Sequence, residues 1–554
     1  MTKPRFGRTT WLLIFIFLTF VQAAADERTD RVDEIFEMFD STHTPGAAVL
    51  VLRDDEVLYK QAYGMASLEL GVPNTTETVF RLGSVSKMFT GAAIALLAEE
   101  GRISLDDSVT KYFPELPEEV YGPVKVRHMI HHTSGIRDSE ALYPVLGMEY
   151  SQWYTHGMFL DMLARQKSLD FRPGDRFEYS NSGYTLLALI VERISQMPFA
   201  EFVGKRIFEP LGMERSAIQT DHQTFIPDRA AGYAPSESGY VNWMTNNQLV
   251  GHDAVYSSVE DMSFWARALI KGTLGRAVVE RMITRASFND GSVNDYAFGI
   301  LVEDYKGLKT WAHAGWFVGY LAHMVIFPDQ KFSVVCLSNV TQGSPQKACY
   351  RIADIYLEEE LERSLAELRE RKKKPDPRTV DALAGDYVGI DYGDVLSLEI
   401  QDGLPKGKGA PWTFEPSPYG EWDFINYDRS LKMRIVSNGP GSGGIKFEVA
   451  TPFLGLMRFE KFEKMSLSEE ELSEYPGDYV SEEIGARAKI TPGENGLKFE
   501  VGRLSAELLP LSPDRFSAAP GMVTFERDAE GRVTGFGLSQ YGFRNLLFQK
   551  TNDR

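Results

Sequence analysis

Cysteine is nearly absent from this chain. Its 554 residues contain only Cys336 and Cys349, which excludes a disulfide framework as the basis of the fold. The pair can form one bridge in an exported protein or remain two buried thiols, and the sequence leaves both alternatives open. The nine histidines form no Cys/His cluster with the spacing of metal ligands, although His131 and His132 are adjacent. We therefore expect no metal site.

Basic residues are in the minority. The chain has 59 Lys and Arg against 78 Asp and Glu, a formal net charge of −19. This balance argues against a nucleic-acid partner and favours solubility. With 43% hydrophobic and 25% charged residues, the composition is that of a folded protein. The length exceeds what one hydrophobic core supports, so we expect at least two domains.

Long apolar runs are also scarce, with a single one near the start of the chain. Lys3, Arg5 and Arg8 precede "WLLIFIFLTFV", and the small residues of "QAAADE" follow it. These are the three regions of a secretory signal peptide, which predicts cleavage after Ala25. Cleavage would remove three basic and no acidic residues, changing the net charge from −19 to −22. We expect an exported protein, periplasmic or secreted, without a membrane span after cleavage; an uncleaved anchor is the alternative.

Residues 29–362 mix helical and strand patterns. "AAVLVLRDDEVLYKQAYG" predicts two strands around a turn at Asp54-Asp55, and "FSVVCLSNV" predicts another strand. The apolar stretch after residue 84 predicts a helix that ends at Gly101, and "YTLLALIVERISQM" predicts a second. Residues 347–374 predict one long, increasingly charged helix. This order indicates an α/β (α+β) domain with a mainly antiparallel sheet flanked by helices.

An internal repeat follows a charged linker at 363–378. "LAGDYVGI" at 383–390 recurs as "YPGDYVSE" at 475–482, and each copy ends in a similar strand. The repeat predicts two related all-β units, 379–463 and 468–554. They can be two separate, lipocalin-like barrels or the halves of one barrel. Neither copy contains a nucleophile with a base.

Three serines stand three residues before a lysine: Ser84 with Lys87, Ser108 with Lys111, and Ser344 with Lys347. A serine hydroxyl needs a base within hydrogen-bond reach to act as a nucleophile, and on a helix residues three apart share a face. A helix N-terminus and burial both lower the pKa of a lysine, and the adjacent amides can stabilise an oxyanion. Only Ser84 precedes what reads as a buried helix. We prefer it as nucleophile over the alternative, the polar start of a buried helix.

Two further segments carry polar groups suited to this chemistry. In "FRPGDRFEYSNSGY", Tyr179 can relay protons and Asn181 can hold a substrate carbonyl; the alternative is a helix cap by Ser180 or Asn181. In "WAHAGWFVGY", His313-Ala314-Gly315 is the only His-x-Gly of the chain. A glycine there allows backbone to approach a ligand closely, although a lone histidine is more often structural.

In this order, "FRLGSVSKMFTG", "HMIHHTSGI", "FRPGDRFEYSNSGY" and "HAGWFVGY" resemble the serine β-lactamase and penicillin-binding-protein superfamily. The resemblance covers roughly residues 30–360. It is closest to the class C β-lactamase-like branch, which includes DD-carboxypeptidases, D-aminopeptidases and esterases. It implies that no cofactor is needed. It also implies these roles: Ser84 as acylated nucleophile, Lys87 as general base, Tyr179 as second acid/base group, Asn181 as ligand of the substrate carbonyl, the amides of Ser84 and Trp316 as oxyanion hole, and His313 with Gly315 as the third wall of the site.

Other polar residues are expected to be structural. The resemblance gives His128, His131 and His132 a structural role in a loop. His252 and Asp253 can edge the cleft, but we favour a role at the entry of a helix. Asp106-Asp107 is expected to be a solvated edge.

The substrate is less well defined by the sequence. Many β-lactamases have a lysine where this chain has His313, and a largely neutral imidazole attracts a substrate carboxylate less strongly. This makes efficient antibiotic hydrolysis a less expected main activity, although some DD-carboxypeptidases of the branch also carry histidine. A D-aminopeptidase group of the branch has two C-terminal β-barrels, as expected here.

We therefore expect an acyl-enzyme hydrolase of small amides or peptides, D-aminopeptidase or DD-peptidase-like. A carboxylesterase or weak β-lactamase is the alternative. A non-catalytic scaffold is another, disfavoured because Ser84, Lys87 and Tyr179 are all present. The oligomeric state is not predicted.

Overall fold

The computed structural model describes residues 27–39, 42–369, 377–408, 414–416, 423–426, 431–437, 446–451, 455–494, 496–518 and 521–551. The expected signal peptide lies outside the described residues, as do residues 370–376 of the expected linker. Across the described ranges, no helix combines the length and apolar character needed to cross a bilayer.

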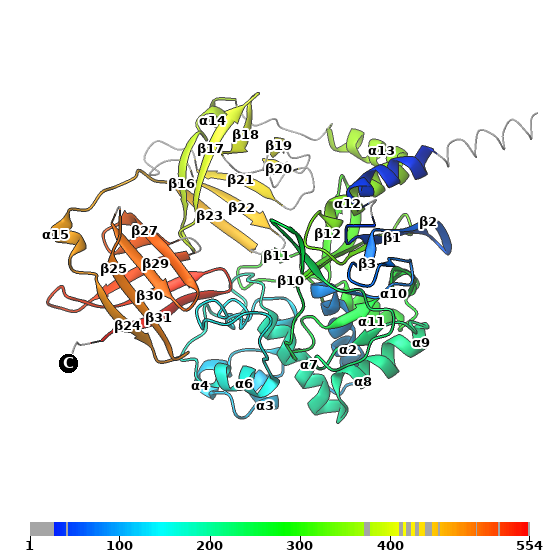
Figure 1. Cartoon of the computed structure of the whole chain (residues 1–554), viewed down its shortest axis with the longest axis horizontal. Coiled ribbons are helices and arrows are strands. Elements are labelled where there is room, and N and C mark those ends of the chain that lie inside the picture. The colour runs from blue at the N-terminus through cyan, green and yellow to red at the C-terminus, as the bar shows by residue number, and fades with distance from the viewer. Residues whose placement is uncertain are drawn as a thin grey trace, which may run out of the picture.

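A six-stranded antiparallel sheet forms the centre of the first domain (Figure 1). Its order is β12 (Leu301–Tyr305), β13 (Leu308–Phe317), β14 (Tyr320–Phe327), β15 (Phe332–Ser338), β1 (Ala47–Arg53) and β2 (Glu56–Tyr63). All residues of β15 are buried, and most of them are apolar; β1 is buried almost throughout. Both faces of the sheet are covered, which favours continuous rather than alternating apolar patterns. The predicted antiparallel sheet is confirmed.

Helices cover the two faces of this sheet. α2 (Lys87–Glu99), α7 (Asn181–Ser195) and α10 (Val259–Lys271) belong to the core on one face. α12 (Pro345–Tyr356) and the helix at 27–36 pack on the other face. That second core also contains Cys336 and Cys349, which are free buried thiols. The two cysteines are therefore not bridged in this structure.

The single long helix predicted for residues 347–374 is wrong. α12 ends at Tyr356, and α13 (Glu358–Arg369) begins after Leu357. Leu357 is fully buried and leaves helical geometry, with φ −111° and ψ 21°. α12 follows the sheet with a buried face, whereas α13 carries charges around most of its surface, so the chain turns where its packing surface ends.

The two C-terminal repeats form separate all-β units, so the alternative that they are halves of one barrel is wrong. The second unit is a closed barrel: β24 (Gly477–Ser481), β25 (Ala486–Pro492), β26 (Leu497–Val501), β27 (Leu504–Ser512), β28 (Arg515–Ala518), β29 (Gly521–Arg527), β30 (Val533–Gln540) and β31 (Phe543–Lys550). The first is an eight-stranded sheet in the order β18 (Leu404–Gly407), β17 (Val395–Gln401), β16 (Gly385–Gly389), β23 (Gly455–Lys461), β22 (Lys446–Thr451), β21 (Lys432–Ser437), β20 (Phe424–Asn426) and β19 (Phe414–Pro416).

The repeated Gly-Asp-Tyr-Val motif makes the same contacts in both units. The Tyr387 hydroxyl donates to the carbonyl of Leu383 at 2.9 Å, and the Tyr479 hydroxyl donates to the carbonyl of Tyr475 at 2.6 Å. The amine of a lysine on the last strand lies 5.8 Å from the tyrosine ring in each unit, Lys461 in the first and Lys550 in the second. Equal contacts at equal positions support a duplicated unit.

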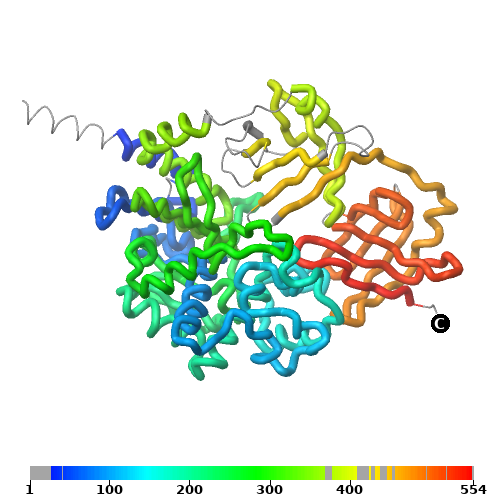
Figure 2. The backbone as a smooth tube through the Cα atoms, turned by 180° about the vertical axis from the view of Figure 1, so that it is seen from behind, coloured from blue at the N-terminus to red at the C-terminus, as the bar shows by residue number. Residues whose placement is uncertain are grey.

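Buried ion pairs hold the barrel to the first domain. Figure 2 shows the barrel lying against that domain. Arg137 pairs with Asp170 at 3.0 Å within the first domain and with Glu483 of the barrel. Arg544 of the barrel pairs with Glu178 at 2.8 Å and with Asp391 of the first β unit at 2.6 Å. These contacts join all three units close to the segment that precedes Tyr179.

Candidate active site

Ser84 lies in a 3₁₀ turn, η2 (Gly83–Ser86), directly before α2. Side chains three residues apart eclipse in such a turn. The Nζ of Lys87, the first residue of α2, is 3.1 Å from the Oγ of Ser84. The predicted proximity of the two groups is therefore present, with Ser84 just outside the α-helix.

The other two Ser-x-x-Lys pairs have a different structure. Ser108 accepts from the amide of Thr110 at 3.3 Å and caps α3 (Val109–Tyr112). Ser344 accepts from the amide of Lys347 at 3.2 Å and caps α12. The expectation that Ser344 precedes no buried helix is wrong, because α12 buries one face against the sheet. In both pairs the serine hydroxyl is the N-cap of a helix.

Lys87 is fully buried and has three hydrogen-bond partners. Besides Ser84, its Nζ contacts Asn181 Oδ1 and the carbonyl of His252, both at 2.8 Å. Burial lowers the pKa of Lys87 to about 7, against the opposing influence of Glu140, Asp138 and Asp253. A neutral amine has two hydrogens and one lone pair. Because Asn181 and His252 take the two hydrogens, the lone pair is directed at the Ser84 hydroxyl, as a general base requires.

Tyr179 lies next to Lys87. Its ring lies 4.6 Å from Lys87 Nζ, and the side chain is 5% exposed. Burial raises the pKa of Tyr179 well above its ordinary value, although a hydrogen bond with Ser84 opposes this. The phenol is therefore neutral and suited to give and regain a proton. Ser180 caps α7 by accepting from the amide of Gly183 at 3.4 Å, so the predicted cap and the placement of Tyr179 coexist.

Two glycines allow the backbone of β13 to lie against the Ser84 turn. A Cβ on Gly315 would be 2.0 Å from the carbonyl oxygen of Leu82. A Cβ on Gly83, which has φ +53°, would be 2.8 Å from the amide nitrogen of Trp316. The expected close approach of a ligand at Gly315 is therefore replaced by a close approach of protein backbone. The same packing brings the backbone of Trp316 beside Ser84, where the oxyanion hole is expected.

His313 lies behind the wall of the site. It is fully buried, its Nε2 is 2.8 Å from the hydroxyl of Tyr296, and its Nδ1 is 2.6 Å from the carbonyl of Ala314. Burial lowers its pKa to about 3, which keeps the imidazole neutral. Ala314, Gly315 and Trp316 line the cavity beside it. The structure therefore places no cation at this position.

The neighbouring histidines have structural contacts. His131 Nδ1 is 2.9 Å from the carbonyl of Tyr296. His132 accepts through Nδ1 from the amide of Ser180 at 3.1 Å, and its ring centroid is 4.1 Å from that of Tyr179. His128 accepts from the amide of Lys125 at 3.1 Å and belongs to a short helix, α5 (Val126–Ile130), rather than the predicted loop.

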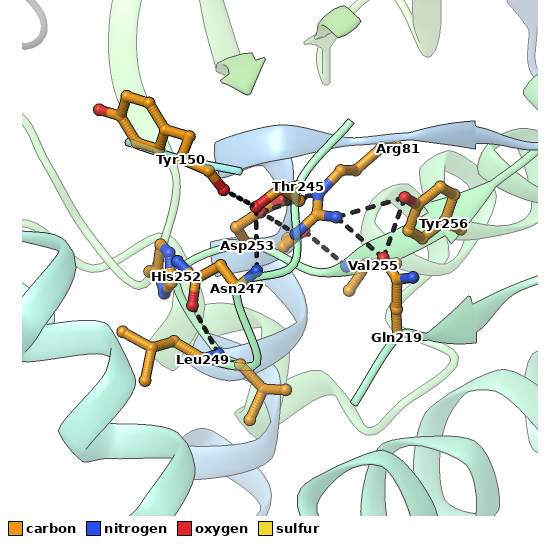
Figure 3. A network of polar contacts seen from close by, with 12 residues as sticks. Arg81, Tyr150, Gln219, Thr245, Asn247, Leu249, His252, Asp253, Val255 and Tyr256 are labelled. Carbon is orange, nitrogen blue, oxygen red and sulfur yellow. Dashed lines mark hydrogen bonds and ion pairs between the residues drawn. The ribbon is translucent and has the colours of Figure 1, made fainter. Parts of the chain in front are cut away.

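The segment "GHDAVYSSVEDM" leads into a helix, as expected, but His252 and Asp253 do not themselves lie at the helix start. α10 begins at Val259 and is capped by Ser258. Asp253 instead forms a buried ion pair with Arg81, whose Nε lies 2.9 Å from Oδ2 (Figure 3). The carbonyl of His252 binds Lys87. His252 therefore lies at the edge of the cleft, next to Lys87 at the start of α2.

Two acidic residues of the site were not anticipated. Glu140 Oε1 lies 2.9 Å from His252 Nε2, and Asp138 Oδ2 accepts from the amide of Asn181 at 2.6 Å. Burial and the neighbouring Glu140 raise the pKa of Asp138 to about 6. In "SGIRDSEALY" nothing distinguishes these acids from surface ones, because their partners are distant in sequence. Asp106, by contrast, is exposed and paired with Lys125 and Arg127, as expected of a solvated edge.

A cavity of about 600 Å³ joins these groups. Ser84, Tyr179, Asn181 and Glu140 line one part, and Tyr150, Trp316 and Phe317 give it an aromatic wall. The barrel contributes Gln540 and Tyr541. The β30–β31 hairpin of the barrel is held by two hydrogen bonds to the first domain. Gln540 Nε2 donates to the carbonyl of Ala141 at 2.9 Å, and the amide of Asp138 donates to the carbonyl of Gly542 at 2.7 Å. Local sequence patterns contain no sign of this contribution.

Comparisons with known proteins agree with this geometry. The Beta-lactamase family model matches residues 24–357. A D-aminopeptidase of Brucella anthropi is 27% identical over 523 residues, covering 91% of this chain and 95% of that protein. Penicillin-binding protein 4* of Bacillus subtilis (strain 168) is 29% identical over 333 residues, covering 56% and 71%.

Among solved structures, an octameric penicillin-binding protein homologue from Pyrococcus abyssi superposes with a TM-score of 0.51 at 22% identity, covering 89% of this chain and 99% of that one. At this identity the likeness shows the shared fold alone. The family model, in contrast, spans more than half of the sequence and contains Ser84, Lys87 and Tyr179. The chain therefore belongs to the Beta-lactamase family.

Proposed function

We propose that this chain is an exported serine hydrolase that cleaves small amides or peptides through an acyl-enzyme, in the manner of a D-aminopeptidase or DD-peptidase. The observation that carries the proposal is the buried Lys87, whose Nζ lies 3.1 Å from Ser84 Oγ and whose other two partners are acceptors. The signal-peptide pattern at 1–25 supports export.

The geometry supports a two-step acyl transfer. Lys87 removes the proton of Ser84, and Oγ attacks the substrate carbonyl to form a tetrahedral intermediate, whose oxyanion the amides of Ser84 and Trp316 would stabilise. Tyr179 gives its proton to the leaving amine and regains one from the Lys87 ammonium. Water then attacks the acyl-enzyme, its proton passes to Lys87, and the acid leaves as Ser84 regains a proton.

The shape of the cavity favours small substrates. Gln540 and Tyr541 of the barrel line the cavity together with Ser84, Tyr150 and Trp316 of the first domain, so both domains bound the space beside Ser84. The likeness to the D-aminopeptidase of Brucella anthropi covers 91% of this chain and so extends into the C-terminal all-β units as well as the first domain. Both observations support an amide or short peptide, with an N-terminal D-residue as the specific form.

Steady-state assays on the purified protein lacking residues 1–25 test this proposal. D- and L-aminoacyl p-nitroanilides and simple p-nitrophenyl esters would be compared, with Ser84→Ala as the control. We expect turnover of D-aminoacyl amides with a D over L preference of at least about tenfold, absent in the control. Ready ester cleavage without any amide turnover would replace the proposal with a carboxylesterase. A protein inert toward both, whose Ser84 also resists acylation, would be a scaffold.

A further inference from the structure

Glu140 is a buried carboxylate between the two groups that bind Lys87. We propose that Glu140 is a positioning residue for the catalytic base: one carboxylate holds both acceptors of Lys87 and thereby directs the lysine lone pair at Ser84. This inference rests on the proposed function and names a residue on which that function depends. Glu140 is 6% exposed, so its bonds to protein groups are not replaced by water.

The contacts form a closed ring around the base. Glu140 Oε2 accepts from Asn181 Nδ2 at 3.1 Å, and Oε1 accepts from His252 Nε2 at 2.9 Å. Asn181 Oδ1 and the carbonyl of His252 each accept from Lys87 Nζ at 2.8 Å. Both anchors of the lysine are therefore bonded to the same carboxylate, although His252 lies 112 residues away from it.

The carboxylate also fixes the direction of each hydrogen bond. An ionised carboxylate only accepts, so Asn181 must turn its NH₂ toward Glu140 and its oxygen toward Lys87. For the same reason His252 carries its hydrogen on Nε2, and Nδ1 accepts from the hydroxyl of Thr185 at 3.0 Å. Without the carboxylate, the amide of Asn181 is free to reverse and present NH₂ to the amine. Lys87 would then lose an acceptor, and its lone pair would lose its direction.

Glu140 is itself held in place by the protein. The amide of Glu140 donates to Asp138 Oδ1 at 2.8 Å, and Asn247 Nδ2 donates to Oε1 at 3.4 Å. The next residue, Ala141, accepts from Gln540 of the barrel. The position of the carboxylate is thus set before any substrate binds, which is what preorganisation of a base requires.

The charge of Glu140 acts on Lys87 as well. The charged groups that raise the pKa of Lys87 are Glu140, Asp138 and Asp253, and Glu140 has the largest effect of the three. His132 and His313 also face Lys87, but burial keeps both neutral. Removing the charge of Glu140 should therefore lower the pKa of Lys87 further. A variant that keeps the charge but shortens the side chain should disturb the geometry while leaving the pKa nearly unchanged.

Phosphonylation of Ser84 in the full-length protein by a fluorophosphonate, in which Oγ bonds to phosphorus and fluoride leaves, tests the inference. Its rate, followed by intact mass from pH 5 to 9, would be compared for wild type, Glu140→Gln and Glu140→Asp. For Glu140→Gln we expect a rate at pH 8 lower by at least about tenfold and a midpoint lower by about one pH unit. For Glu140→Asp we expect the lower rate with the midpoint of wild type. A residue with a merely structural role would not move the midpoint.

The outcomes separate this inference from the function on which it rests. A folded Glu140→Gln protein with the wild-type rate and midpoint would overturn the role of Glu140 and leave the hydrolase intact. If Glu140→Gln does not fold, Glu140→Asp decides, because a wild-type rate in that variant would overturn the role equally. No phosphonylation of wild type at any pH would overturn both proposals.

Discussion

Burying Lys87 changes what its amine can do at neutral pH. A lysine in water is a protonated cation up to its ordinary pKa of 10.5, but Lys87 is fully buried and its pKa is about 7. The free amine is then accessible near neutral pH, and its Nζ lies 3.1 Å from the Ser84 hydroxyl. Tyr179, with its raised pKa, keeps its proton and is the proton donor of the proposed mechanism. Burial lowers the pKa of the Lys87 amine and raises the pKa of the Tyr179 phenol, which is why we assign Lys87 as the base and Tyr179 as the acid.

The pH dependence of acylation follows from this assignment. Because only the neutral form of Lys87 accepts a proton, the rate of Ser84 acylation should rise with pH through a midpoint close to 7. Lys87→Arg keeps a cation that does not deprotonate, so its rate should be at least about a hundredfold lower at pH 8. Quenched labelling with intact-mass detection measures both. A wild-type midpoint near the ordinary pKa of lysine would contradict the proposed role of Lys87.

A second serine provides a matched control. Ser108 has the same spacing to Lys111 but caps α3. Ser108→Ala should lower the free energy of unfolding by about 1 kcal/mol and leave acylation unchanged. Denaturant unfolding and labelling on one preparation would show it. Loss of labelling in this variant would mean that the choice of Ser84 among the three pairs is wrong.

The proposed oxyanion hole depends on close packing between two elements. β13 packs its backbone at Gly315 onto the carbonyl of Leu82, and the turn η2 packs Gly83 onto Trp316. Neither contact leaves room for a side chain. The amide of Trp316 therefore owes its place beside Ser84 to glycine on both sides.

A methyl group at Gly315 should separate these elements. In Gly315→Ala the new Cβ would lie 2.0 Å from the oxygen of Leu82, so β13 must shift and carry the amide of Trp316 with it. We expect acylation about a hundredfold slower, the cost of losing one oxyanion donor. Gly204→Ala is the control, because a Cβ there meets nothing within 4 Å; it should acylate normally. Equal rates in both variants would show that the packing of β13 on η2 is not needed.

Local elements could be predicted from the sequence, and long-range contacts could not. β1, β2 and α7 follow from short apolar patterns, and Ser84, Lys87 and Tyr179 lie in motifs that resemble a known family. The break between α12 and α13 depends on where the sheet ends. Glu140 depends on His252, 112 residues away, and no local pattern records that contact. Asp253 was misjudged for the same reason, since its partner Arg81 lies 172 residues earlier.

At the scale of the whole molecule, the barrel forms part of the wall of the candidate active site. Its hairpin binds Asp138 and Ala141, on either side of Glu140, and Tyr541 lines the cavity. Arg544 secures this docking through Glu178 and Asp391. Glu178 directly precedes Tyr179, so the ion pair ties the barrel to the residue before the proton donor.

Removing the Arg544–Glu178 ion pair should weaken the docking of the barrel onto the first domain. Arg544→Ala leaves Glu178, which is 5% exposed, as a buried unpaired carboxylate, at a cost of about 3–5 kcal/mol. Arg532→Ala in the same barrel removes a pair whose arginine is 74% exposed and should cost less than about 1 kcal/mol. Thermal unfolding and limited proteolysis compare the two. Equal melting temperatures would indicate that the barrel does not depend on Arg544.

The most direct test of the account is mass spectrometry of the protein after incubation with a fluorophosphonate and, separately, a penicillin. We expect a stable fluorophosphonate adduct on the peptide that contains Ser84, absent from the Ser84→Ala variant. A penicillin adduct on the same peptide would extend the site to peptidoglycan-like substrates. A folded wild-type protein without any adduct, or with the adduct on another residue, would contradict the claim that Lys87 activates Ser84.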